Sequence, residues 1–204
     1  MKRNFQFFII SFFIFCLQTK AQQSNDSTLI AHFKTIGGVI GWGNSISKNT
    51  DYQTYYLIAD YSQSFKAPKK KDFVAWYAEP QFNFVKAGST PKGGIDYEFG
   101  LNLGIRNYVK INDGFYFYQM LGSGPHYISA EVGRQANGFI FSDNLAIGTF
   151  LRLTKKNLFL NFQYVQRHIS NAGLKDPNGG VNSYNFVIGL SRLKQLQFSG
   201  QLQQ

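Results

Sequence analysis

Residues 95–110 read Ile-Asp-Tyr-Glu-Phe-Gly-Leu-Asn-Leu-Gly-Ile-Arg-Asn-Tyr-Val-Lys, and this stretch decides the fold. Every second position from Ile95 to Ile105 is apolar or aromatic, and Val109 continues the series. The positions between them, from Asp96 to Arg106, carry charges, an amide or glycine. Side chains that repeat with a period of two project to opposite faces of a β-strand. The stretch therefore predicts a two-faced strand much longer than the usual length of about five or six residues.

Seven further segments show related patterns, and the last of them repeats the alternation of apolar and polar residues. The predicted strands lie at about residues 33–47, 52–64, 72–86, 94–110, 114–130, 138–153, 157–170 and 182–193. An interior of charges and amides inside an apolar exterior is the inverse of a soluble barrel. We therefore predict an all-β chain that forms an eight-stranded antiparallel transmembrane β-barrel of the outer membrane. Residues 22–204 form its single domain, with a short tail after residue 193.

The predicted connections differ between the two ends of this barrel. Residues 111–114 and 154–157 form tight turns, and the basic turn 65–71 lies at the same end. The connections at 86–93, 131–137 and 171–181 are longer and richer in Gly, Pro and Asn. Short periplasmic turns and long external loops are typical of outer-membrane barrels.

The alternative fold is a soluble β-sandwich or a lipocalin-like barrel, whose apolar strand faces would fill one core. Periodicity alone does not separate the two folds. The strand lengths favour the membrane barrel, as do the aromatic residues near predicted strand ends, which are typical of interfacial girdles. Examples are Tyr52, Tyr55, Tyr56, Trp76 and Tyr77.

The first 21 residues have the three parts of a secretory signal peptide. Lys2 and Arg3 precede an apolar stretch over residues 5–17, and Ala21 ends a possible cleavage site. The apolar stretch is shorter than the about 20 residues that a membrane-spanning helix needs. Cleavage after Ala21 also removes Cys16, the single cysteine, so the mature chain has neither a disulfide nor a thiolate site.

The mature chain is basic, since cleavage leaves 18 of the 21 basic residues against 11 acidic ones, a net charge of +7. No phosphate-binding loop, nucleic-acid motif or metal-ligand spacing is present in the sequence. We therefore expect no cofactor, no metal and no nucleic-acid partner. The basic excess is expected to face lipid phosphates, and the barrel is expected to be a monomer.

Residues 167–182 carry the candidate chemistry. His168 and Ser170 lie two positions apart, on the strand face that also carries Leu158, Leu160, Phe162 and Tyr164. An imidazole can activate a serine hydroxyl when a third group fixes its tautomer. Asn182 has the matching position on the next strand, so its side chain is expected to orient His168. We expect Asn171 and Gly173 to supply donors to an oxyanion.

The run His168-Ile169-Ser170-Asn171-Ala172-Gly173-Leu174-Lys175, with Pro177-Asn178 and Gly180 after it, closely resembles the lipid A 3-O-deacylases of the PagL type, also labelled acyloxyacyl hydrolases. Segments 98–104, 121–129 and 138–144 are similar to other strands of that family. The resemblance implies an outer-membrane hydrolase that removes an ester-linked acyl chain from lipid A or lipopolysaccharide. It makes His168 the base, Ser170 the nucleophile and Asn171 the oxyanion donor.

One position departs from the family, because members on which the assignment rests carry Glu where this chain has Asn182. An amide orients the imidazole but adds no negative charge, and Asp143 and Asp176 are candidates to supply that charge. Arg134, Arg167 and Lys175 are candidate contacts to lipid A phosphates. Two other functions stay open, namely a catalytically silent barrel with a structural or binding role, and a phospholipase.

Overall fold

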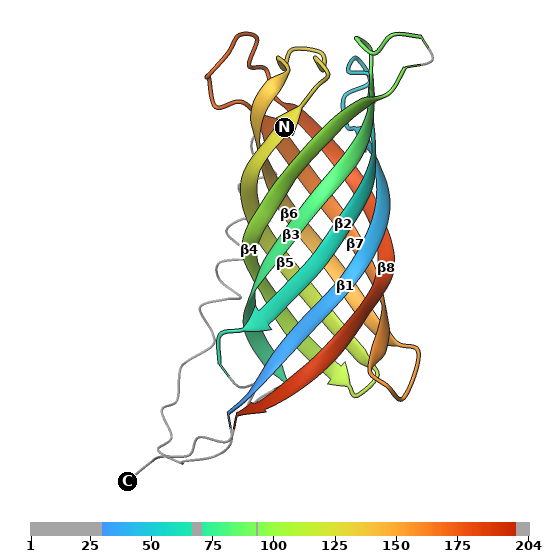
Figure 1. Ribbon diagram of the computed structural model, residues 1–204, viewed down its shortest axis with the longest axis vertical. Helices are drawn as coiled ribbons and strands as arrows, with labels where there is room; N and C mark the ends of the chain where they lie inside the picture. The colour runs from blue at the N-terminus through green and yellow to red at the C-terminus, as the bar shows by residue number, and fades with distance from the viewer. Residues whose placement is uncertain (1–29, 67–70, 93, 199–204) are drawn as a thin grey trace.

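The computed structural model describes residues 30–66, 71–92 and 94–198, so the predicted signal peptide lies outside the described residues. Eight antiparallel strands form a closed barrel, in which each strand pairs with the next and β8 pairs with β1 (Figure 1). The strands are β1 (Ile30–Ser45), β2 (Tyr52–Ser64), β3 (Asp72–Ala87), β4 (Asp96–Asn112), β5 (Phe115–Ile128), β6 (Gly138–Arg152), β7 (Leu158–Ser170) and β8 (Val181–Phe198). Within the described ranges, no helix combines the length and apolar character needed to cross a membrane.

The predicted fold class is confirmed, but the seam between the first and last strands is longer than predicted. β1 begins at Ile30, and its register with β8 runs from the Ile30–Phe198 pair to the Ser45–Ser183 pair. The prediction of a tail directly after residue 193 is therefore wrong for residues 194–198. These residues continue β8 because the earlier start of β1 gives their backbone groups hydrogen-bonding partners, and closure of a barrel removes unpaired strand edges.

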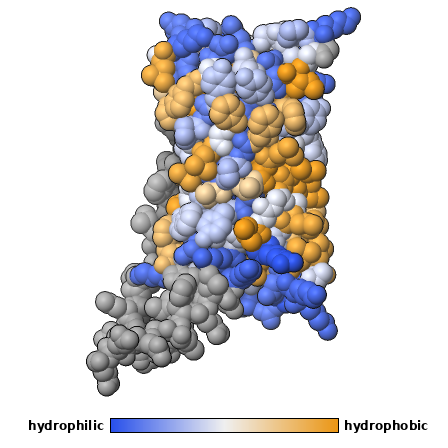
Figure 2. All heavy atoms as spheres, viewed as in Figure 1, coloured by the Kyte–Doolittle hydropathy of each residue, from blue (hydrophilic) through white to orange (hydrophobic). Residues whose placement is uncertain are grey.

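The barrel carries its apolar side chains on the outside. Ile36 and Ile40 are each 58% exposed, and exposed apolar residues recur on all eight strands. We call these outward side chains the apolar belt, and Figure 2 shows them as a band between two more hydrophilic ends. Glu98 and Arg106, by contrast, are fully buried in the lumen. A soluble barrel or sandwich needs the opposite arrangement, which rules out the alternative fold.

The lumen is filled in layers rather than by polar groups alone. Two buried clusters of charged residues lie within it, an upper ionic cluster of Glu98, His126 and Arg167 and a lower ionic cluster of Asp60, Glu79 and Arg106. Beyond the lower cluster, aromatic rings pack against one another; Phe73 and Tyr108, for example, stack with ring centroids 5.0 Å apart. The expectation of an interior made of charges and amides is therefore wrong at this end, where aromatic residues fill the space.

The two ends of the barrel differ as predicted. Segments 46–51, 88–95, 129–137 and 171–180 connect strands at what we call the long-loop end, drawn at the top of Figure 1. The opposite, short-turn end includes the two-residue turn Asp113–Gly114, where the Gly114 N–H donates to Asn112 Oδ1 at 2.8 Å. A hydrogen bond from Lys110 holds the pKa of the Asp113 carboxyl below its usual range. The candidate site residues lie at the long-loop end.

Candidate active site

The strand β7 presents His168 and Ser170 on the outer surface of the barrel. His168 and Ser170 are half-buried on the outside of the barrel. The side chains on either side of His168 in the chain, Arg167 and Ile169, are buried in the lumen. This division follows from the period of two, because the inward positions of β7 must fit the lumen. Both side chains therefore lie on the face of β7 opposite to the lumen.

His168 is held by the neighbouring strand. His168 and Asn182 are Cα partners in the antiparallel register of β7 and β8, and His168 Nδ1 lies 2.9 Å from Asn182 Oδ1. A carboxamide oxygen only accepts, so the imidazole donates from Nδ1 in this arrangement. Nε2 then keeps its lone pair, as a general base for a serine hydroxyl requires.

Gly180 packs against the other edge of the imidazole, a contact that the sequence reasoning missed. A Cβ added at this residue would lie 2.6 Å from His168 Cε1 and 3.1 Å from Nε2. The backbone at Gly180 also has a φ of +63°, which other residues rarely adopt. Glycine at this position therefore leaves room for the ring, and the Gly-Gly pair at 179–180 was the available signal in the sequence.

The Ser170 hydroxyl shares the outward face with the imidazole, but the two are not hydrogen-bonded. Within the described strands, the side chain of His168 is hydrogen-bonded to Asn182 and not to Ser170. Catalytic hydrogen bonds are often formed only when substrate is present, so the missing bond is compatible with Ser170 as a nucleophile and His168 as its base. On its other side, Ser170 is the register partner of Phe141 in β6.

The two predicted oxyanion donors are bound within their own loop. The Asn171 side chain is buried, and its Nδ2 donates to the Lys175 carbonyl at 2.5 Å. Its Oδ1 accepts the Gly173 N–H at 3.0 Å, and its own N–H donates to Asn178 Oδ1 at 3.1 Å. Gly173 has a φ of +82°, which fits its place in this turn. Both residues follow Ser170 closely in the chain, but the Asn171 Nδ2 and Gly173 N–H donors are already hydrogen-bonded to acceptors within the loop.

Of the two acidic candidates, one lies in register with the site. Asp143 on β6 is the Cα partner of His168, points outward and accepts a hydrogen bond from Ser123 Oγ at 2.6 Å. It therefore flanks His168 on the side opposite Asn182. Asp176 lies in the exposed 171–180 loop and makes no hydrogen bond or ion pair with His168 among the described residues.

The candidate phosphate contacts divide between the lumen and the loops. Arg167 is buried and paired with Glu98, so its prediction as a contact to external phosphate is wrong, because the strand alternation that points His168 outward sends Arg167 inward. Arg134 and Lys175 lie exposed in the loops at the long-loop end. Lys175 Nζ donates to Asn137 Oδ1 at 2.6 Å, which ties the 171–180 loop to the 129–137 loop.

An apolar groove on the outer surface lies below the candidate site. Its volume is about 360 Å³, and Tyr164 in its wall is four residues from His168 along β7, or about 13 Å. The lining residues come from β1, β5, β6, β7 and β8: Trp42, Phe117, Ile147, Gly148, Thr149, Phe162, Gln163, Tyr164, Phe186, Val187 and Ile188.

Among the described residues, no group of three or more His, Cys, Asp or Glu side chains could hold a metal ion.

Comparisons with known proteins identify the family. The family model described as "Lipid A 3-O-deacylase (PagL)" matches residues 40–191. No curated protein matches the chain. The crystal structure of the outer membrane enzyme PagL is similar, with a TM-score of 0.54 and 17% identity over 76% of this chain and 97% of that one. Ail of Yersinia pestis, solved in complex with the heparin analogue sucrose octasulfate, gives a TM-score of 0.50 and 11% identity over 82% of this chain and 100% of Ail. These structural likenesses bear on the fold, while the family match covers most of the chain, which therefore belongs to the lipid A 3-O-deacylase (PagL) family.

Proposed function

We propose that this protein is an outer-membrane serine esterase that removes an ester-linked acyl chain from lipid A. The observation that carries the proposal is the contact between His168 and Asn182 on the outer surface, with Ser170 on the same face. A polar group on a lipid-facing surface is costly, so such a constellation needs a purpose. The family match supports the reaction class.

In the proposed reaction, Ser170 Oγ attacks the acyl carbonyl carbon while His168 Nε2 takes the hydroxyl proton. The tetrahedral intermediate collapses, and the proton passes from Nε2 to the leaving sugar hydroxyl. The acyl group is then an ester of Ser170. Water attacks this ester with His168 again as the base, which releases the fatty acid and restores the serine hydroxyl.

Asn182 orients the imidazole in this scheme but stabilises its charged form only weakly. The bond from His168 Nδ1 fixes the tautomer that leaves Nε2 free to accept a proton. A carboxylate at the same place would also stabilise the imidazolium that forms in the transition state. Asp143 in β6 adds negative charge on the opposite side of the ring but makes no hydrogen bond or ion pair with it.

Asn171 and Gly173 complete the proposal as donors to the oxyanion. Both belong to the turn that follows Ser170, in which the Gly173 N–H donates to Asn171 Oδ1. To act on the substrate, the Gly173 N–H must exchange Asn171 Oδ1 for the oxyanion, and Asn171 Nδ2 must exchange the Lys175 carbonyl. The charge on an oxyanion favours such an exchange, because charge-assisted hydrogen bonds are about twice as strong as neutral ones.

The apolar groove suits the acyl chain of such a substrate. It opens on the outer surface, where lipid surrounds the barrel, and its lining is almost entirely apolar or aromatic. A chain in the groove would run along β7 toward the short-turn end, with its carbonyl near Ser170. The exposed Arg134 and Lys175 in the loops above are suited to lipid A phosphates.

The remaining parts of the proposal concern location and assembly. We place the long-loop end at the cell exterior, because long external loops and short periplasmic turns are the rule for such barrels. The outer leaflet then brings lipid A to the site. Residues 1–21 are proposed to be a signal peptide removed during export, and the barrel is proposed to act as a monomer without a cofactor or nucleic acid.

The experiment is acyl release by the purified, refolded barrel in mixed micelles with lipid A, read by mass spectrometry of the product. We expect wild-type protein to release fatty acid and Ser170→Ala to lose the activity. Ser45→Ala removes a serine hydroxyl at the same end of β1 and should keep it. Release at an unchanged rate by Ser170→Ala would reject the assignment.

The two alternative functions are distinguished in the same assay. Asn182 and the absence of a Ser170–His168 bond in the described strands favour the silent barrel, which predicts no release from any ester by the folded protein. A phospholipase would release fatty acid from diacyl phospholipid offered beside lipid A. Release from lipid A in preference to phospholipid is the outcome that we expect.

A further inference from the structure

The upper ionic cluster lies directly behind the candidate active site. Arg167 precedes His168 in β7, so the two side chains leave neighbouring residues toward opposite sides of the barrel wall. Arg167 is 3% exposed and Glu98 is fully buried. Because one peptide bond joins Arg167 to His168, any displacement of the backbone at Arg167 also displaces the imidazole.

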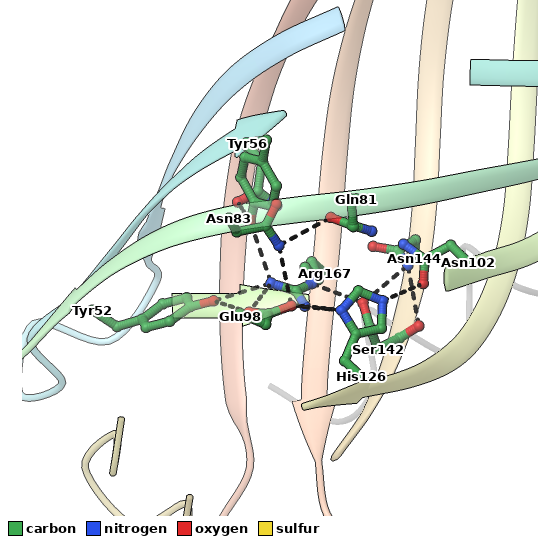
Figure 3. A network of polar contacts seen from close by, with 11 residues as sticks. Tyr52, Tyr56, Gln81, Asn83, Glu98, Asn102, His126, Ser142, Asn144 and Arg167 are labelled. Carbon is green, nitrogen blue, oxygen red and sulfur yellow. Dashed lines mark hydrogen bonds and ion pairs between the residues drawn. The ribbon is translucent and has the colours of Figure 1, made fainter. Parts of the chain in front are cut away.

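Arg167 is held from several strands across the lumen. Its guanidinium pairs with Glu98 of β4, and Nη1 lies 3.2 Å from Oε2 (Figure 3). Nε donates to Ser142 Oγ of β6 at 2.7 Å, and Nη1 donates to the Tyr52 hydroxyl of β2 at 3.0 Å. A planar guanidinium with several fixed partners has little freedom to move. The backbone of β7 at residue 167 is thus fixed relative to three other strands.

The carboxylate that receives Arg167 is itself fixed by other side chains. His126 Nδ1 of β5 lies 2.6 Å from Glu98 Oε1, and Asn83 Nδ2 of β3 donates to the same oxygen at 3.2 Å. His126 Nε2 lies 3.1 Å from Asn102 Oδ1, which anchors the ring in turn. Figure 3 shows these residues converging on Glu98 and Arg167. The ion pair is therefore a rigid connection between β7 and the far wall.

We propose that Glu98 and Arg167 are positioning residues for His168, which they hold in the place where its Nδ1 meets Asn182 and its Nε2 faces the substrate. The catalytic part of this inference rests on the proposed esterase function. Reaction rates are sensitive to such placement, since a displacement of about 1 Å can cost on the order of 100-fold in rate. The pair does not touch substrate and acts only through the backbone of β7.

The lower ionic cluster provides a matched control inside the same lumen. Arg106 is also fully buried, with Nη2 3.0 Å from Asp60 and 2.9 Å from Glu79. It lies eight residues from Glu98 along β4, or about 26 Å, and its chain neighbours carry no candidate chemistry. We therefore expect loss of Arg106 to perturb the lumen to a similar degree without moving residue 168.

The first arm of the test measures lipid A deacylation by Arg167→Met and Arg106→Met. We expect kcat to fall about 10- to 100-fold in Arg167→Met with KM within about twofold, because orientation and not binding is lost. In Arg106→Met, both constants should stay within about threefold of wild type. Equal losses of kcat in the two variants would show a general effect of stability and overturn the proposal.

The second arm needs no activity. Nitrogen-15 NMR of the imidazoles reports which ring nitrogen carries the proton, and the chain has three histidines, which single His→Gln variants assign. We expect the Nδ1–H form at His168 in wild type and Arg106→Met, and a mixture of tautomers in Arg167→Met. An unchanged His168 signal in Arg167→Met overturns the proposal, even if the wild type proves inactive and the esterase function fails.

A further variant separates positioning from failure to fold. Arg167→Met removes the guanidinium partner of the buried Glu98 carboxylate and leaves His126 and Asn83 as its contacts, and loss of one partner of a buried ion pair is strongly destabilising. The double variant Glu98→Leu/Arg167→Met removes both charges, so we expect its heat-modifiable mobility on a denaturing gel to match that of the folded wild type. Its kcat should nevertheless stay low and its His168 tautomers mixed. A folded double variant with the kcat and the His168 tautomer of the wild type would refute the positioning role.

Discussion

His168 and Asn182 face each other across β7 and β8, with 2.9 Å between the imidazole Nδ1 and the carboxamide Oδ1. The contact joins two strands that are adjacent in the barrel and are connected by the 171–180 loop. The Asn182 side chain orients the imidazole but carries no negative charge. A carboxylate at this place would both orient the imidazole and stabilise the imidazolium, so substitutions at residue 182 can test the two effects separately.

Asn182→Glu is expected to raise the rate of acyl release. A hydrogen bond to a charged group contributes about 1 kcal/mol more than a neutral one, which corresponds to roughly fivefold in rate if it acts on the imidazolium in the transition state. Asn182→Ala should lower the rate, because nothing then fixes the tautomer. Initial rates with lipid A under single-turnover conditions measure both effects. A slower Asn182→Glu enzyme of unchanged fold would contradict this account.

Gly180→Ala is expected to abolish most of the activity while the barrel still folds. The added methyl group would lie 2.6 Å from His168 Cε1, so the ring must leave its place beside Asn182. Gly38→Ala is the control, since a Cβ at Gly38 meets no atom within 4 Å. Deacylation rates and heat-modifiable gel mobility distinguish a displaced ring from a misfolded barrel. Full activity in Gly180→Ala would mean that the ring position seen here is not required.

The long alternating segments made the barrel predictable from sequence. In β4 and β8, the period of two continues over many residues, so both the strand and the direction of each side chain followed from the pattern. The same rule placed His168, Ser170 and Asn182 on one surface. The end of β8 was mispredicted because its length depends on where β1 begins, and pairing between the chain ends leaves no signal in a local pattern.

The features that the sequence did not reveal arise from contacts across the barrel. Glu98 and Arg167 are 69 residues apart, and nothing in either strand identifies the other as its partner. The use of Asn171 within its own loop was also unexpected, because a buried carboxamide can bind the backbone as readily as a substrate. Alternation predicts which face a residue takes but not which partner it finds there.

Filling the apolar groove is expected to change the preferred length of the acyl chain. Thr149→Trp places a large ring in the wall of the groove, so long acyl chains should lose rate while short ones keep it. Leu57→Trp is the control, because Leu57 lies on β2, outside this groove. Competition between a short-chain and a long-chain ester, read by mass spectrometry, gives the ratio of the two kcat/KM values. An equal change of this ratio in both variants would exclude the groove as the acyl site.

Loss of one charged partner of the Glu98–Arg167 pair is expected to destabilise the barrel more than loss of both partners. Glu98→Leu leaves Arg167 buried without a counter-charge, and loss of one partner of a buried pair costs about 3–5 kcal/mol. Glu98→Leu/Arg167→Met has no unpaired charge, so its loss of free energy of unfolding should be smaller than that of Glu98→Leu alone. Guanidinium unfolding in micelles, followed by the fluorescence of Trp42 and Trp76, measures these free energies. Additive losses in the double variant would mean that the two side chains are not energetically coupled, and the connection between β4 and β7 would then not depend on their ion pair.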